Sequence, residues 1–342
     1  MICGIGLLVF MAAVTGSRSY SNYRALVERA TNLDDLRAEI PDVLEKFVPL
    51  AVKAAQNFDG KNLPLYSHGE ELVVDETDSV RNAGLALMLM QLAPFCESPS
   101  DATVVRQAAV AASRNMLDTK PTDVQAGSFA ARALLAFVNS DGAHCLPEDT
   151  ERLEHFVEIA STRAIHGHLE PVFERGEVLI SLCELTAYKS DILNSVIASA
   201  LSPTAWYPAS AGNLNEVFEL NWFSQFLRAA RRKGFPVDPK VARRASRQLS
   251  FWGPVAAREN TNFRVVSMEG LAALLPLLSD TNDHFDAIKS LVLSCLASEL
   301  RQDMYGGALG FINHSVARLD ITGHFISGLL LLLDQPDRGH NT

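Results

Sequence analysis

The sequence predicts an all-α protein folded as an (α/α)6 toroid, a closed ring of six inner and six outer helices. Hydrophobic residues make up 48% of the 342 residues, which is enough for one large buried core. Two kinds of helical segment alternate along the chain, one apolar on all sides and one amphipathic. The apolar segments start at intervals of about 40 to 54 residues, which is typical of a repeated two-helix unit.

Six segments are apolar on nearly every face and must therefore be buried on all sides. They are Arg81–Ala93, Ala126–Val138, Gly176–Ala187, Glu216–Ala230, Ser267–Leu278 and Ile321–Leu333. A closed ring needs one such buried row, whereas an open solenoid needs polar caps instead. Pro276 interrupts the fifth segment and predicts a kink or an early end of that helix.

The other segments carry one apolar stripe and one charged face, as expected for helices on the outside of a ring. They are Leu36–Phe58, Ala102–Leu117, Thr150–Ile165, Ser190–Leu201, Pro239–Trp252 and Asp283–Leu300. No linker or change of composition divides the chain. We therefore expect a single domain over residues 20–334, followed by a polar tail over residues 335–342.

The chain begins with an uncharged apolar run over residues 2–16 that ends in small residues, which is typical of a secretory signal. The run is short for a membrane span, and no basic residue precedes it. We expect residues 1–19 to be a signal peptide or a membrane-proximal segment. The protein is then secreted, periplasmic or envelope-associated, with membrane association through the N-terminus as one form of this location and a cytoplasmic location as the alternative.

Charge and motifs exclude several classes of function. Acidic residues outnumber basic ones by 40 to 30, which gives a formal charge of −10 and argues against nucleic-acid binding. The cysteines and histidines show no spacing suited to zinc, and no phosphate-binding or dinucleotide-binding fingerprint occurs. We therefore expect neither a metal nor a cofactor.

The ring geometry predicts where functional residues lie. The N-termini of all inner helices open on one face, where their partial positive charge stabilises carboxylates. Helix capping explains polar residues such as Asp78 and Asp320 at these ends. It does not explain ionisable side chains one or two turns inside an apolar helix, where burial is costly. Those residues are Glu177, Glu219, Glu269 and His324.

The last apolar segment carries the most informative group of polar residues. Asp320 and His324 are four residues apart and share a helical face, so the carboxylate can orient and charge the imidazole. Arg318 stands beside them, and the glycines of the preceding stretch can bring Tyr305 over the same face. We expect these residues to form part of the site.

Two short patterns carry a resemblance to a known group of proteins. The pattern Arg-x-Asp-x-x-x-His at Arg318, Asp320 and His324 follows a Gly-Gly-x-x-x-Phe stretch over residues 306–311. It resembles the last helix pair of bacterial α/α-toroid proteins related in fold to glycoside hydrolases, uronate epimerases and polysaccharide lyases. Arg-Asn-Ala-Gly over residues 81–84 is similar to the start of the first inner helix in that group. The resemblance implies a carbohydrate-active site and a polysaccharide or oligosaccharide substrate.

Carbohydrate chemistry then offers two arrangements. Two carboxylates can flank a glycosidic bond, which favours Asp78 or Glu76 together with Glu219. A base and an acid can instead move a proton next to a uronate, which favours His324 with Tyr305. Other candidates would bind the substrate through charge, hydrogen bonds or ring stacking: Arg81, Glu177, Trp206, Tyr207, Trp222, Arg264, Glu269 and Arg318.

Hydrolase, lyase and epimerase activities all remain open, as do two other classes of function. A non-catalytic scaffold or glycan-binding subunit predicts that the acids of the inner helices pair with arginines and reach no open cleft. An isoprenoid cyclase or prenyltransferase-like enzyme predicts a deep apolar cavity below residues 75–78. Their sequence, Asp-Glu-Thr-Asp, faintly resembles the acidic motif of cyclases.

Overall fold

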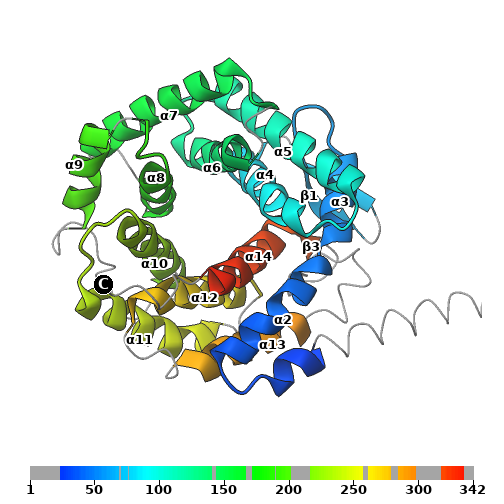
Figure 1. Cartoon of the computed structure of the whole chain (residues 1–342), viewed down its shortest axis with the longest axis vertical. Helices are drawn as coiled ribbons and strands as arrows, with labels where there is room; N and C mark the ends of the chain where they lie inside the picture. The colour runs from blue at the N-terminus through cyan, green and yellow to red at the C-terminus, as the bar shows by residue number, and fades with distance from the viewer. Residues whose placement is uncertain are drawn as a thin grey trace, which may run out of the picture.

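The protein folds as a closed ring of helices with an inner and an outer layer (Figure 1). The computed structural model describes residues 24–68, 71–75, 77–140, 144–166, 172–188, 190–201, 216–256, 261–278, 284–297 and 317–334. The predicted signal segment over residues 1–19 and the predicted tail over 335–342 lie outside the described residues. Over the described ranges the all-α prediction and the (α/α)6 arrangement are confirmed.

The inner layer consists of the six segments that the sequence marks as apolar on all sides. They form α4 (Ser79–Leu92), α6 (Val124–Ser140), α8 (Val172–Glu184), α10 (Glu216–Arg232), α12 (Thr261–Leu274) and α14 (Leu319–Leu333). Each inner helix packs against the next, and α14 packs back against α4 (Figure 1). The ring is therefore closed by contact between the first and the last inner helix.

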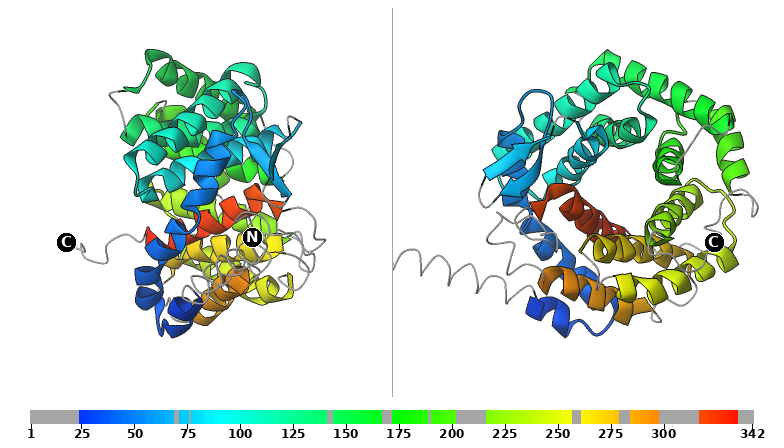
Figure 2. Two further views of the ribbon diagram at one scale, coloured as in Figure 1. Left: turned by 90° about the vertical axis from the view of Figure 1, so that its right-hand side faces the viewer. Right: turned by 180° about the vertical axis from the view of Figure 1, so that it is seen from behind.

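The outer layer consists of the amphipathic segments, each of which precedes its inner partner in the chain (Figure 2). It comprises α2 (Leu33–Glu45), α3 (Val48–Gln56), α5 (Pro99–Thr119), α7 (Pro147–Ile165), α9 (Ser190–Ala200), α11 (Pro239–Ala256) and α13 (Phe285–Ala297). The first outer helix was expected to be continuous but is split into α2 and α3. Pro49 lies in the first turn of α3, where it lacks the N–H that a continuous helix would require.

Proline also shapes the fifth inner helix. As predicted, α12 ends early, at Leu274, and a 3₁₀ turn over Leu275–Leu277 contains Pro276. The change to 3₁₀ geometry follows because the proline ring clashes with an α-helical carbonyl on the preceding turn.

A small antiparallel sheet, which the sequence analysis did not predict, lies at one edge of the ring. It comprises β1 (Pro64–His68), β2 (Glu71–Val74) and β3 (Ala317–Arg318), in the order β2-β1-β3. Tyr66 pairs with Arg318, and Ser67 with Ala317. The sheet therefore joins the chain segment before the first inner helix to the segment before the last one.

The inner helices approach one another closely where small residues face a neighbour. A Cβ atom added to Gly328 of α14 would lie 3.2 Å from the Cα and 3.3 Å from the backbone nitrogen of Glu269 on α12. Backbone atoms cannot give way as a flexible side chain can. Gly328 therefore sets the separation of α12 and α14.

We expect Gly328→Ala to lower the free energy of unfolding by about 1–3 kcal/mol, because the added methyl group forces α12 and α14 apart. Gly84→Ala is the matched control, since the nearest atom to its added Cβ, in Phe129, lies 4.0 Å away. That change should be neutral or stabilise the protein by up to about 1 kcal/mol, because alanine favours helix more than glycine does. Urea unfolding of both variants measures the difference, and equal stabilities would contradict the close approach.

Candidate active site

A cavity of about 360 Å³ lies inside the ring, among the inner helices. Its volume is within the range of small-molecule sites. The lining residues come from all six inner helices. On α6, α10 and α14 they run from near the N-terminus to about the middle of the helix. The predicted site residues that line it are Arg81, Glu177, Trp222, Glu269, Arg318, Asp320 and His324.

Three predicted residues are described but do not line this cavity. Asp78 caps the N-terminus of α4, where its carboxylate accepts a hydrogen bond from the backbone N–H of Arg81. Glu219 is partly buried on α10. Arg264 extends toward the outer layer, where its Nη1 lies 3.4 Å from the carbonyl oxygen of Ser294 on α13. Glu76, Trp206, Tyr207 and Tyr305 lie outside the described residues.

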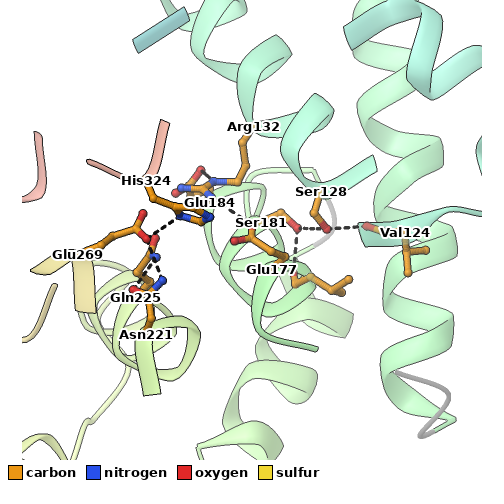
Figure 3. Close-up of polar contacts among 11 residues, drawn as sticks. Val124, Ser128, Arg132, Glu177, Ser181, Glu184, Asn221, Gln225, Glu269 and His324 are labelled. Atoms are coloured by element: carbon orange, nitrogen blue, oxygen red, sulfur yellow. Dashed lines mark hydrogen bonds and ion pairs between the residues drawn. The ribbon is translucent and has the colours of Figure 1, made fainter. Parts of the chain in front are cut away.

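A histidine and a glutamate from neighbouring inner helices form the best-defined pair in the cavity (Figure 3). The Nδ1 atom of His324 on α14 lies 3.0 Å from Oε2 of Glu269 on α12. The same oxygen accepts a hydrogen bond of 2.8 Å from Nδ2 of Asn221 on α10, whose own side-chain oxygen accepts one from Gln225. The carboxylate of Glu269 is therefore held by two donors from two helices.

This pairing differs from the one that the helical spacing suggested. The i,i+4 relation favoured Asp320 as the partner of His324, but Asp320 is held by two arginines instead. Arg318 donates to both oxygens of Asp320, with Nε at 2.9 Å from Oδ1, and Nε of Arg81 lies 3.4 Å from Oδ2. Pairing of Arg318 with β1 fixes its backbone at the start of α14, and Arg318 rather than Asp320 is the N-cap residue.

The surroundings of His324 favour its charged form. Burial acts against the imidazolium, but the Glu269 carboxylate, with a smaller contribution from Asp320, raises the pKa of His324 above its usual value. The ring also lies beside Trp222, with 5.5 Å between the ring centroids, and Trp222 in turn contacts Phe129. An imidazolium beside an aromatic wall is thus one face of the cavity.

A second acid, Glu177 on α8, lines the cavity and is fully buried. Its Oε2 lies 3.3 Å from Nη1 of Arg132 on α6, and Nε of Arg132 donates to Glu184 at 3.0 Å (Figure 3). Oε1 of Glu177 is buried and has no hydrogen-bond partner among the residues that the structure describes. Burial raises the pKa of Glu177 to about 8, although Arg132 and His324 favour its ionised form.

Sequence reasoning missed four polar residues of this region: Arg132, Glu184, Asn221 and Gln225. Arg132 interrupts an otherwise apolar inner helix, as Glu177 does, so the criterion that selected Glu177 applies to it equally. Asn221 and Gln225 are an i,i+4 pair, and their side chains are joined by a hydrogen bond of 3.2 Å. Only the fold shows that Glu184, at the end of α8, meets Arg132.

The described part of the chain contains no group of three or more His, Cys, Asp or Glu side chains that could hold a metal ion. Within the same ranges, no helix combines the length and apolar character of a membrane span. The side chains that line the cavity include carboxylates, a histidine, arginines and the aromatic rings of Phe129, Phe218 and Trp222.

We expect Glu269→Gln to lower the pKa of His324, because the substitution removes the negative charge that stabilises the imidazolium. NMR titration of the His324 ring measures this shift, with Glu151→Gln on the exposed face of α7 as the control. The stabilisation from the charged pair is present below the unfolded histidine pKa of about 6.5 and is lost as the pH rises through the higher folded value. The substitution should therefore destabilise the protein more at pH 6 than at pH 9. An unchanged titration would exclude the charge coupling.

The chain matches no model of a protein family, and no curated protein matches its sequence. Its fold is similar to the crystal structure of a mutant unsaturated glucuronyl hydrolase from Streptococcus agalactiae. The TM-score is 0.59 at 11% sequence identity, and the alignment covers 92% of this chain and 96% of that one. At this identity the similarity shows the fold alone, and that fold is the (α/α)6 toroid of a glycoside hydrolase.

Proposed function

We propose that the protein is a carbohydrate-active enzyme that hydrolyses a glycosidic bond of an acidic saccharide in the cavity inside the ring. The observation that carries this proposal is that two buried acids, Glu177 and Glu269, line one cavity and have different hydrogen-bond partners. Glycoside hydrolysis requires one carboxylic acid that donates a proton and one carboxylate that acts as a base or nucleophile.

The two acids differ because their surroundings differ. Glu177 is protonated near neutral pH because burial raises its pKa to about 8. Glu269 accepts hydrogen bonds from Asn221 and His324, an arrangement that suits an ionised carboxylate. Glu177 is therefore the proton donor in the proposed reaction. The Glu269–His324 pair supplies the second group, in which the carboxylate of Glu269 either attacks the sugar as a nucleophile or acts as a base that activates a water molecule.

Other residues of the cavity fit a sugar as the substrate. The indole ring of Trp222 provides an aromatic wall on which a pyranose ring can stack. The guanidinium of Arg81 pairs with Asp78 and Asp320 and lies at the cavity, where its side chain is 39% exposed and can also meet a substrate carboxylate. The similar hydrolase is named for a glucuronyl group, and such a group carries a carboxylate.

The two competing functions are less well supported. A scaffold would have its inner-helix acids paired with Arg81, Arg264 and Arg318 and no cleft. Asp320 is paired in this way, with Arg318 and Arg81. Glu177 and Glu269, however, have other partners and line a cavity. An isoprenoid enzyme would have an apolar cavity below residues 75–78. The carboxylate of Asp75 instead accepts hydrogen bonds from Thr77, and the cavity contains several charged side chains.

The test is hydrolysis of a panel of uronate-terminated and neutral oligosaccharides. Hydrolysis is measured by the release of reducing ends, and mass spectrometry detects the addition of water to the products. We expect turnover of a uronate-containing member. Glu177→Gln and Glu269→Gln should each lower kcat by about 10²–10⁴-fold, which is the usual contribution of a general acid or base.

Glu151→Gln, on the outer layer, serves as the matched control and should retain full activity. Hydrolysis of neutral members only would overturn the acidic substrate class. Full activity of the Glu177→Gln and Glu269→Gln variants, or no hydrolysis of any member by the folded protein, would overturn the proposed reaction.

A further inference from the structure

A second cavity, of about 400 Å³, is lined mainly by residues of α6, α8, α10 and α14, from about the middle of these helices to their C-terminal ends. Arg132 and Gln225 line both cavities and so form part of the wall between them. Glu184 lines only the second cavity, and its side chain is 37% exposed there. The two carboxylates that share Arg132 therefore face different environments.

Arg132 is the link between these environments. Its Nε donates to Glu184 and its Nη1 to Glu177, and the arginine side chain itself is only 11% exposed. A single guanidinium carries one positive charge and cannot neutralise two carboxylates. Of two acids competing for it, the one in contact with solvent ionises more readily, because desolvation penalises the charged form of the buried one.

Glu184 therefore carries the negative charge opposite Arg132, and Glu177 keeps its proton. Oε2 of Glu177 accepts from Arg132, so the proton resides on Oε1, which is buried without a partner among the described residues. A neutral acid group in this position costs far less free energy than a charged one.

We propose that Arg132 and Glu184 are positioning residues that set the protonation of Glu177 from the far side of the ring. Arg132 favours release of the proton, and Glu184 opposes the release by occupying the guanidinium. This coupling depends on the proposed function in one respect only, the reaction in which the proton of Glu177 is used.

Two other inner helices carry ionisable groups that act on Glu177. Glu269 on α12 favours the protonated form of Glu177, and His324 on α14 favours the ionised form. From α10, the residues that line the first cavity are neutral: Phe218, Trp222 and Gln225. Arg228 and Arg232 of the same helix line the second cavity, as Glu184 does. Of the charged groups that act on Glu177, Glu184 alone can be altered without touching the candidate active site, since it lines only the second cavity.

We expect Glu184→Gln to lower the pKa of Glu177 by about one pH unit, because it removes a neighbouring negative charge and frees Arg132. Arg132→Met should raise that pKa by about 1–3 units, because it removes the favourable positive charge. The protonated carboxyl band of Glu177 is identified by infrared difference spectroscopy. Each spectrum compares a protein with the same protein carrying Glu177→Gln. The intensity of this band as a function of pH measures the pKa without any substrate.

Glu151→Gln is the control and should leave the titration of Glu177 unchanged. If Arg132→Met fails to fold, the titration of Glu177 in Glu184→Gln still tests the coupling. This variant should fold, because Glu184 is partly exposed and glutamine has the same shape as glutamate. A Glu177 titration that is unmoved or raised in Glu184→Gln would overturn the proposal.

Where a substrate is hydrolysed, the alkaline limb of the rate profile should move to lower pH in Glu184→Gln. A shifted infrared titration without hydrolysis would instead refute the proposed function and leave the coupling intact.

Discussion

Six inner helices that run in one direction around a common axis enclose a space that must be filled or lined by their own side chains. Apolar residues fill most of it, which is why these helices are apolar on every face. The polar side chains that remain are costly in such surroundings unless they find partners. The buried polar groups therefore join neighbouring helices: Asn221 bonds to Glu269, Glu269 to His324, and Arg132 to Glu177.

The same requirement separates the interior into two cavities. Arg132 and Gln225 line both cavities, and Arg132 is held by carboxylates and Gln225 by Asn221. Each cavity is thereby bounded by inner helices at its sides and shares part of a polar wall with the other. The hydrogen bonds that stabilise the ring are thus also the ones that define the chemistry on either side of the wall.

The sequence allows the helices to be predicted because each inner and outer segment shows its burial in its own residues. An ionisable residue within an apolar helix also stands out in the sequence, and of the four selected in this way Glu177, Glu269 and His324 line the cavity whereas Glu219 does not. The partners of these residues could not be predicted in the same way. Reasoning along one helix pairs His324 with Asp320, whereas the actual partner, Glu269, comes from another helix. The small sheet was missed for a similar reason, because β3 is only two residues long and pairs with a strand far away in the chain.

The pairing of β1 with β3 and the packing of α14 on α4 bring together segments made early and late in synthesis. During translation, the first five inner helices emerge before the chain can close the ring. An incomplete ring leaves the apolar flank of α4 uncovered, a surface of the kind that promotes aggregation of nascent chains. Ring closure also contributes the most non-local contacts of the fold, and such contacts form slowly. The last helix pair thus determines when the molecule becomes a finished protein, and with it when both cavities acquire a complete wall.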